Sequence, residues 1–165
     1  LNLRGTLTET LGSRRPDEEQ RRLSLTMHLP RDPVVVDADR VRLTQVVSNL
    51  VDNAVKYTPD AGHIDVAVTA SAYEATIVVQ DDGGGIPAER VGSIFEPFVQ
   101  LAESRNAALG GMGLGLPLVR RLTELHGGTV DVTSGGQNHG SRFAVHLPLP
   151  GPVRSSRLEP AGRHR

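Results

Sequence analysis

Hydrophobic and polar positions in and just before residues 45–58 recur with the period of an α-helix. A helix turns by about 100° per residue, so residues three or four apart share a face. The apolar, core-facing side consists of Leu43, Val46, Val47, Leu50, Val51 and Ala54. The other side carries Gln45, Asn49, Asn53 and Lys56. Because Asn is a poor helix former, this polar stripe indicates either a solvated face or a binding site.

Alternating apolar and polar positions predict strands before and after this helix. The predicted strands are residues 23–29, 34–36, 64–68, 75–80, 129–133 and 141–148. Residues 75–80 are the most apolar, so we expect them in the middle of a sheet. The turn at 70–74 makes this strand a hairpin with the one before it.

Further helices are expected at residues 1–11, at 87–91 and from Gly115 to His126, where Gly127 and Gly128 end the pattern. Asp37 or Asp39 is placed to cap the central helix. Helices combined with hairpins indicate an α+β fold, in which the helices cover one face of a mixed sheet.

Length and composition narrow the possible functions. The 165 residues suggest one domain, and 38% hydrophobic residues suffice for a core. A net charge of −1 argues against general binding to nucleic acid or anionic membranes. The chain has no cysteine and no apolar run near the roughly 20 residues that span a bilayer. Because it begins with Leu1, we expect it to be a piece of a longer protein.

Two glycine clusters follow the polar helix. The first follows Asp81 at the end of the dense strand, and the second, at 110–115, opens the last helix after a loop at 99–111. Neither has the Gly-Lys-Ser/Thr of a P-loop or the βαβ context of a dinucleotide fold. A nucleotide site of another design remains. Helix N–H groups at Gly113 and Gly115 suit phosphate, Lys56 can reach a phosphate, and Asp81 can accept a hydrogen bond from adenine.

The order of these motifs resembles the catalytic ATP-binding domain of sensor histidine kinases over about residues 37–148. The matching motifs are Asn49-x-x-x-Asn53-Ala54-x-Lys56-Tyr57, Asp81-x-Gly83-x-Gly85-Ile86, Phe95-x-Pro97-Phe98 and Gly111-x-Gly113-Leu114-Gly115-Leu116. His126-Gly127-Gly128 and Gly140-Ser141-x-Phe143 also fit. The resemblance implies the two-layer α/β sandwich called the Bergerat fold, which DNA gyrase and MutL ATPases share.

The resemblance also implies a role for each matching residue, with ATP and Mg²⁺ as the cofactors. Asn53 would bind Mg²⁺, Asn49 would support it, and Lys56 would meet the phosphates. Tyr57 would pack near the base and Asp81 would bind the adenine amine, while Gly83 and Gly85, followed by Ile86, allow close approach. Residues 99–112 would form a lid hinged at Phe95 and Phe98. The phosphates would be wrapped by Gly111, Gly113 and Gly115, with Leu114 and Leu116 between and after them. Arg105 is either a γ-phosphate contact or a solvated arginine.

A histidine kinase of this type transfers the γ-phosphate to a histidine on a separate dimerisation domain, for relay to a response regulator receiver domain. None of the six histidines lies in a helix with the acidic neighbour typical of the acceptor: His28, His63, His126, His139, His146 and His164. We therefore expect residues 1–16 to be a remnant of the dimerisation helix or its linker, 17–149 the catalytic domain and 150–165 a disordered tail or linker. The parent would be a homodimer, membrane-anchored or not, with this domain in the cytoplasm.

Two departures and three alternatives stay open. Asp82 stands where the family often has Asn, and Met112 where a polar residue is common, so either could weaken nucleotide binding. A gyrase-type ATPase would need a Glu general base at Asn49, since an amide cannot take a proton. A serine kinase that binds a sigma factor shares the fold without a dimerisation domain, so the expected helix remnant at residues 1–11 argues against it. A degenerate scaffold is the third alternative.

Overall fold

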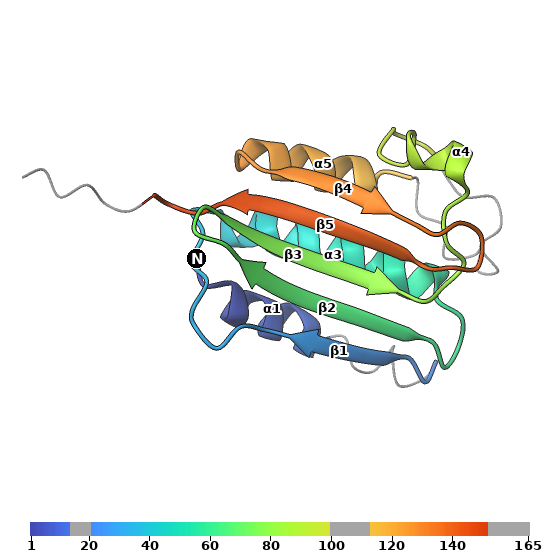
Figure 1. Cartoon of the computed structure of the whole chain (residues 1–165), viewed down its shortest axis with the longest axis horizontal. Coiled ribbons are helices and arrows are strands. Elements are labelled where there is room, and N and C mark those ends of the chain that lie inside the picture. Colours follow the sequence, from blue (N-terminus) through green and yellow to red (C-terminus); the bar gives the residue numbers. More distant parts are fainter. Residues whose placement is uncertain (14–20, 100–112, 152–165) are drawn as a thin grey trace, which may run out of the picture.

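The computed structural model describes residues 1–13, 21–99 and 113–151. In this part of the chain a five-stranded sheet has its helices on one face, with the strand order β1-β2-β3-β5-β4 (Figure 1). The strands are β1 (Ser24–His28), β2 (His63–Ala70), β3 (Glu74–Asp81), β4 (Thr129–Thr133) and β5 (Ser141–Pro148). The helices are α1 (Leu3–Gly12), α3 (Arg40–Tyr57), α4 (Ala88–Val91) and α5 (Gly115–Leu125). The predicted α+β class is confirmed.

The sheet is mixed, as predicted. β1 pairs with β2 in parallel, and the other three pairings are antiparallel. β3 lies in the middle, and its hairpin with β2 is confirmed. Because β3 is central, Asp81 at its end lies next to Ser141 at the start of β5, which is its register partner.

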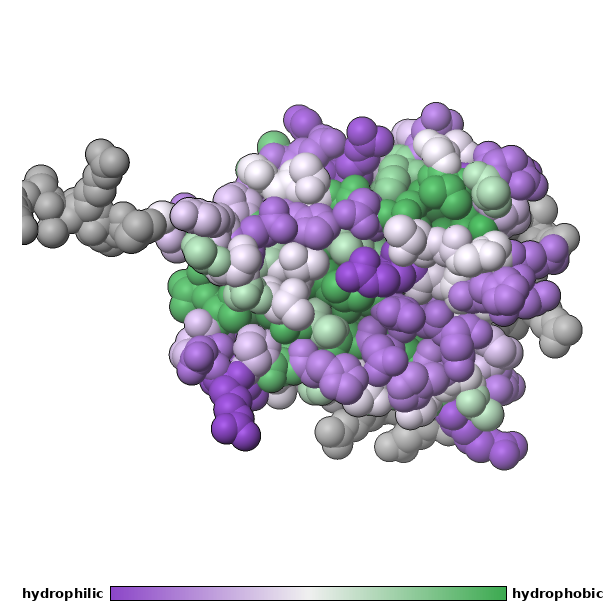
Figure 2. Space-filling view, in the orientation of Figure 1, coloured by the Kyte–Doolittle hydropathy of each residue, from purple (hydrophilic) through white to green (hydrophobic). Residues whose placement is uncertain are grey.

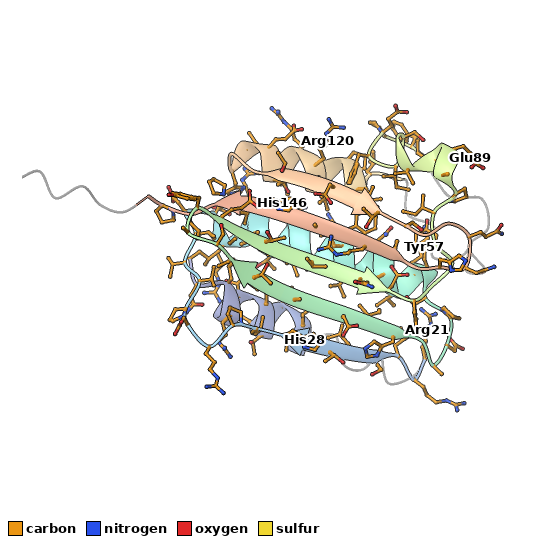
Figure 3. The ribbon with its side chains drawn as sticks, in the orientation of Figure 1. Arg21, His28, Tyr57, Glu89, Arg120 and His146 are labelled. Carbon is orange, nitrogen blue, oxygen red and sulfur yellow. The ribbon has the colours of Figure 1, made fainter. Side chains whose placement is uncertain are left out.

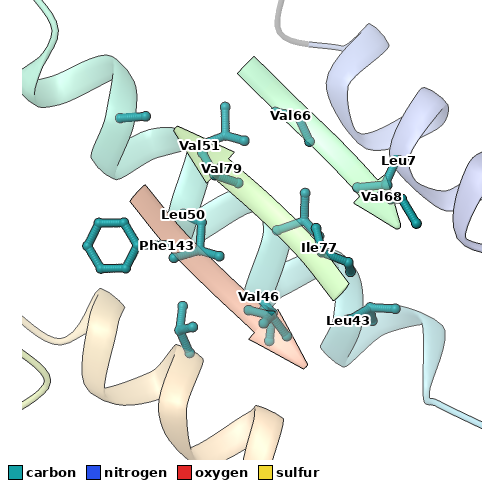
Figure 4. Packing of buried hydrophobic residues seen from close by; sticks show 14 of the residues in the cluster. Leu7, Leu43, Val46, Leu50, Val51, Val66, Val68, Ile77, Val79 and Phe143 are labelled. Atoms are coloured by element: carbon teal, nitrogen blue, oxygen red, sulfur yellow. The ribbon is translucent and has the colours of Figure 1, made fainter. Parts of the chain in front are cut away.

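The central helix begins five residues earlier than the predicted segment, at Arg40. Of the two candidate caps, Asp39 is the one used, since its side chain accepts a hydrogen bond of 2.8 Å from the Arg42 N–H. All six apolar residues predicted for the core-facing side of α3 are buried. They pack against apolar side chains of the central strands, such as Ile77 of β3 and Phe143 of β5 (Figure 4).

The helix expected at the start of the chain is α1, and its three leucines lie in the same core as α3 and the sheet. They are Leu3, Leu7 and Leu11, each at most 3% exposed. The start of α1 is also tied to residues 34–36: the Val36 N–H donates to the Leu1 carbonyl and the Leu3 N–H to the Val34 carbonyl, both at 3.0 Å. α1 therefore shares the core of the residues that follow it.

The strand predicted at residues 34–36 is wrong. Val34 and Val36 are buried, but the segment makes only an isolated bridge between Val35 and Asn2 and joins no sheet. Three consecutive β-branched residues have high strand propensity, yet their backbone groups are already paired with the first residues of α1. Tertiary contacts with α1 have overridden the local preference.

The other face of the sheet carries no helix within the described residues. Figure 2 shows this face, which is largely hydrophilic with smaller apolar areas among the hydrophilic residues. Outward-facing residues include Asp65 of β2, Gln80 of β3 and His146 of β5, while their neighbours along each strand point into the core. The described residues include no helix long and apolar enough to cross a lipid bilayer.

Candidate functional site

The polar stripe of α3 lies at the edge of the core. Asn49, Asn53, Lys56 and Tyr57 are all half-buried, whereas Gln45 near the start of the stripe is exposed. Asn53 lies one helical turn after Asn49, and Lys56 lies about two turns after Asn49, so the three residues share one side of the helix. The ammonium group of Lys56 lies 5.1 Å from the centre of the Tyr57 ring, a distance at which a cation is attracted to an aromatic face. Figure 3 shows Tyr57 at the C-terminal end of α3.

Asp81 is the buried carboxylate of the site, with 6% of its surface exposed. Its Oδ1 accepts a hydrogen bond of 2.8 Å from the Gly83 N–H, and its Oδ2 accepts one of 2.6 Å from the Ser141 hydroxyl. Burial raises the pKa of Asp81, although these hydrogen bonds act in the opposite direction. Each carboxylate oxygen can accept a second hydrogen bond, so Asp81 is held in place and can still bind a donor.

The first glycine cluster forms a loop, residues 83–86, that packs on the last turn of α3. The Gly84 N–H donates to the Tyr57 carbonyl at 3.1 Å. A Cβ atom on Gly83 would lie 2.3 Å from the same carbonyl oxygen, so only glycine fits there. Gly85 has a φ of +70°, a conformation that glycine adopts without strain, and Ile86 is buried. This glycine loop therefore places Asp81 beside the Tyr57 end of the polar stripe.

Asp82, the first departure from the family pattern, binds the backbone at the start of β2. Its Oδ1 accepts a hydrogen bond of 2.8 Å from the His63 N–H at the start of β2, and its own N–H donates to the His63 carbonyl at 3.2 Å. The carboxylate thus points to the first residue of β2. Its charge still contributes to the raised pKa of Asp81.

Within the described residues, the second glycine cluster is represented by Gly113 and Gly115 at the start of α5, which packs against α3. A Cβ atom on Gly115 would lie 4.0 Å from Cγ of Asn49, so the first turn of α5 lies beside the polar stripe. Leu116 is buried, while Leu114 is 41% exposed. The first N–H groups of a helix carry a partial positive charge and lack partners within the helix, so this end of α5 can attract an anion beside Asn49.

The two residues that flank the predicted lid, Phe98 and Gly113, are joined by a hydrogen bond. The Phe98 N–H donates to the Gly113 carbonyl at 3.1 Å, and the two residues have φ values of +64° and +69°. Phe98 is 72% exposed. Phe95, the other predicted hinge residue, instead packs edge-on against Phe143, with ring centres 6.1 Å apart. Arg105, Gly111 and Met112 lie outside the described residues, so the expectations for them stay predictions.

Ser141 and Ser134 are polar residues of this region to which the sequence patterns assign no role. Ser141 binds Asp81, and the Ser134 hydroxyl accepts a hydrogen bond of 2.9 Å from the Ile86 N–H of the glycine loop. Gly140-Ser141-x-Phe143 matches the family pattern, so a signal for Ser141 was present in the sequence. Its contact with Asp81 follows from the register between β3 and β5, which no local pattern contains.

The described histidines that make side-chain contacts do so with other parts of this domain. His126 donates from Nδ1 to the Leu122 carbonyl at 2.7 Å, and its Nε2 accepts from the Asp39 N–H at 3.1 Å. His146 lies between two carboxylates on the open face of the sheet (Figure 3), and His28 and His63 both contact Asp65. His126 therefore has a structural role at the end of α5.

Comparison with known proteins gives the same assignment as the motifs. Residues 38–151 match the family described as histidine kinase-, DNA gyrase B-, and HSP90-like ATPase. The alginate biosynthesis sensor protein KinB of Pseudomonas aeruginosa is 37% identical over 134 residues. That alignment covers 81% of this chain but 22% of KinB, so the chain spans less than a quarter of this relative.

Solved structures extend the likeness to the fold. The mycobacterial sensor histidine kinase MprB superposes with a TM-score of 0.78 at 27% identity, over 91% of this chain and 98% of that one. The catalytic domain of histidine kinase ThkA superposes with a TM-score of 0.79, also at 27% identity, over 91% and 97%. The chain therefore belongs to the histidine kinase-, DNA gyrase B- and HSP90-like ATPase family, as a catalytic domain of the sensor histidine kinase type.

Proposed function

We propose that this domain binds Mg-ATP and donates the γ-phosphate to a histidine on a separate dimerisation domain. The observation that carries the proposal is the convergence of two segments on the polar side of α3. The glycine loop packs on Tyr57, and the first turn of α5 lies beside Asn49. The distance along α3 between these two residues, just over two helical turns or about 12 Å, suits a nucleotide with its base and phosphates at opposite ends.

The buried carboxylate suits adenine. The exocyclic amine of adenine is a donor, and Asp81 offers an acceptor held by Gly83 and Ser141. Guanine has a carbonyl at the corresponding position, which would face the carboxylate without a shared proton. We therefore assign Asp81 to base recognition, with Gly83, Gly85 and Ile86 as the backbone close to the base and Tyr57 packed beside it.

The phosphates would lie between Lys56 and the start of α5. Lys56 supplies a positive charge, and Gly113 to Leu116 supply the N–H groups of the first turn. Mg²⁺ usually takes one or two protein oxygens together with phosphates and water, which the Asn53 amide, supported by Asn49, can provide. The described residues include no group of three His, Cys, Asp or Glu side chains that could hold a metal by themselves. When bound, Mg²⁺ neutralises the phosphate charge.

The transfer needs positioning and charge neutralisation rather than a nucleophile on this domain. Asn49 and Asn53 would orient the phosphates, and Asp81 would hold the base so that the γ-phosphate faces the acceptor. The acceptor histidine would belong to a dimerisation domain of the same homodimeric parent. The next acceptor would be a response regulator; a structure of histidine kinase ThkA in complex with the response regulator protein TrrA is among the similar solved structures.

The outer boundaries and the location of the parent are also part of the proposal. We place the catalytic domain at residues 17–149 and a tail or linker at 150–165. Residues 1–16 would adjoin the dimerisation domain, although the packing of α1 in this core favours counting that helix with the catalytic domain. We propose a cytoplasmic site of action for a parent that is membrane-anchored or not.

Among the alternatives, hydrolysis as in gyrase-type ATPases is disfavoured because Asn49 stands where a general base is needed. A sigma-factor-binding serine kinase is no longer disfavoured by residues 1–11, since that helix belongs to the core of this domain. The choice between a serine and a histidine acceptor rests on the family relatives, which are sensor histidine kinases.

The direct test is thermal unfolding of this chain with and without Mg-ATP. A ligand that binds only the folded state stabilises it by about 2.7 kcal/mol when its free concentration is about 100 times Kd. We expect Tm to rise by several degrees with Mg-ATP and less with Mg-GTP. An unchanged Tm at millimolar Mg-ATP would favour the scaffold. Radiolabelled ATP should leave no phosphohistidine on this chain alone, and label should appear on the dimerisation domain once that domain is added. Slow hydrolysis without acceptor would favour an ATPase.

A further inference from the structure

The turn between β4 and β5 packs against the glycine loop and is hydrogen-bonded to its backbone. This turn, residues 134–140, is here called the serine turn. The Gly140 N–H donates to the Gly83 carbonyl at 3.0 Å, and the Asn138 N–H donates to the Gly84 carbonyl at 2.7 Å. The glycine loop therefore has two supports: the last turn of α3 on one side and the serine turn on the other.

Glycine is required where the two segments touch. A Cβ atom on Gly85 would lie 2.0 Å from the Gly136 carbonyl oxygen, and one on Gly140 would lie 2.0 Å from the Asp81 carbonyl oxygen. Both glycines also have positive φ values, +70° and +67°. Contact between the two backbones is therefore direct, with no room for a side chain between them.

Ser134 is the side chain that links the two segments. Its hydroxyl accepts the Ile86 N–H at 2.9 Å and the Gly136 N–H at 3.2 Å, and it donates to the Gly140 carbonyl at 2.6 Å. The hydrogen bond from the Ile86 N–H to the Ser134 hydroxyl joins the end of the glycine loop to the serine turn. The half-buried hydroxyl thus closes a ring of contacts that runs through Gly140 to Asp81.

We propose that Ser134 is a positioning residue for nucleotide binding, which acts by holding the glycine loop so that Asp81 keeps its orientation toward the base. This inference rests on the proposed function, since the base is assigned to Asp81. The path is short: Ser134 holds Ile86 and Gly140, Gly140 holds Gly83, and the Gly83 N–H holds Oδ1 of Asp81. Loss of the hydroxyl releases the far end of the glycine loop while leaving α3 and the start of α5 unchanged.

Ser71 provides a matched control within the same chain. It lies in the turn between β2 and β3, where its hydroxyl accepts the Tyr73 N–H at 3.3 Å and the Glu74 N–H at 3.1 Å and donates to the Glu74 carbonyl at 3.3 Å. Like Ser134, it joins two N–H groups and one carbonyl in a hairpin turn. Its partners lie at the other end of β3 from Asp81, so it shares the structural role but not the position.

The experiment measures the Kd of Mg-ATP by calorimetry for the whole chain and for Ser134→Ala, Ser134→Thr and Ser71→Ala, with the Tm of each. We expect Ser134→Ala to weaken Mg-ATP binding about fivefold to tenfold, as for the loss of a hydrogen bond that holds a binding group. Ser134→Thr retains the hydroxyl and should stay within about twofold of wild type. Ser71→Ala should lower Tm without weakening the binding of Mg-ATP.

Amide hydrogen exchange of Ile86 gives a second readout. It should become faster in Ser134→Ala and stay slow in Ser134→Thr and Ser71→Ala, because the Ile86 N–H loses its acceptor only in the first variant. If Ser134→Ala does not fold, Ser134→Cys replaces it, since a thiol has similar size and is a weak acceptor. The same weakening of Mg-ATP binding is expected for this variant.

The outcomes separate the two proposals. If wild type binds Mg-ATP but Ser134→Ala stays within twofold of it, or if Ser71→Ala weakens binding as much, the role of Ser134 is overturned. If wild type itself binds no Mg-ATP, the proposed function falls. Faster Ile86 exchange with unchanged Mg-ATP binding would also count against Ser134 as a positioning residue, since it would show that the hydrogen bond is structural alone.

Discussion

The hydroxyl group of Ser141 donates a hydrogen bond of 2.6 Å to Oδ2 of Asp81, and both side chains are buried. The two residues are register partners on the adjacent strands β5 and β3. The contact leaves the carboxylate with a fixed orientation in a place where its charge is poorly solvated. The Asp81 side chain is therefore both the proposed acceptor for the base and a carboxylate whose charge is costly to bury. The first two predictions concern this side chain.

Replacement of Asp81 by Asn should remove the preference for ATP over GTP. An amide in the same place can turn its NH₂ group toward the base, which favours the guanine carbonyl over the adenine amine. We expect Asp81→Asn to weaken Mg-ATP binding at least tenfold, by comparison with the loss of a hydrogen bond to a charged group. Competition with a fluorescent ATP analogue measures both nucleotides. A selectivity equal to that of wild type would show that another residue reads the base.

We expect the difference in the free energy of unfolding between wild type and Asp81→Asn to depend on pH. Because burial raises the pKa of Asp81 in the folded state, the folded protein binds this proton more tightly than the unfolded chain does. The resulting stabilisation is fully present below the unfolded pKa and is lost as pH rises through the folded one. The free energy of unfolding of wild type relative to Asp81→Asn should therefore rise as pH falls toward 4. Urea unfolding of both proteins measures it, and a difference that stays constant with pH would contradict the burial of an ionised carboxylate.

Asn53→Ala should remove the Mg²⁺-dependent part of ATP binding while leaving the fold intact. The side chain is half-buried on the polar stripe, so its truncation should cost about 1 kcal/mol of stability or less. The affinity for ATP is measured in the presence of Mg²⁺ and in the presence of EDTA. Relative to wild type, Asn53→Ala should bind ATP more weakly only in the presence of Mg²⁺. Gln45→Ala, an exposed position on the same stripe, is the control and should change neither. If EDTA weakened binding to Asn53→Ala as much as to wild type, Asn53 would not be the Mg²⁺ ligand.

His126→Ala should lower stability without affecting nucleotide binding. The imidazole ring joins the C-terminal end of α5 to the Asp39 N–H at the start of α3, and loss of both hydrogen bonds should cost about 1–3 kcal/mol. The start of α5, where we place the phosphates, lies about 16 Å away along the helix. Chemical denaturation measures the loss. His28→Ala, which removes an exposed side chain on β1, should change stability by less than about 0.5 kcal/mol.

Two glycines should respond to alanine in opposite directions. Gly5 lies in α1 with open space where a Cβ atom would be added, so Gly5→Ala should stabilise the fold by about 0.5–1 kcal/mol through helix propensity. At Gly83 the added carbon would collide with the Tyr57 carbonyl, so Gly83→Ala should destabilise the fold and weaken Mg-ATP binding. Thermal unfolding of the two variants provides the comparison. A loss of stability in Gly5→Ala would show that α1 does not tolerate a side chain there.

Much of the fold could be predicted because its signals are periodic and local. The apolar side of α3, the alternation in β2 and β5 and the glycines after α5 each occur within a few residues of one another. The prediction for residues 34–36 was wrong because three valines satisfy a local rule for strands, whereas their backbone groups pair with the start of α1. The leucines of α1 have helical spacing, which predicts a buried face. The spacing does not show that this face is buried in the core of the catalytic domain rather than in a dimerisation domain.

Motif spacing along a chain needs no tertiary contact, so the residue types available for a nucleotide site and their order can be read from the sequence alone. The nearness of Gly115 to Asn49 and of the glycine loop to Tyr57 comes from the tertiary structure, because it depends on how α3 packs against α5 and against the sheet. The tertiary structure also sets the supports of the site. Ser141 and Asp81 are 60 positions apart and Ser134 and Ile86 are 48, and hydrogen bonds over such separations arise from strand register rather than from any local pattern.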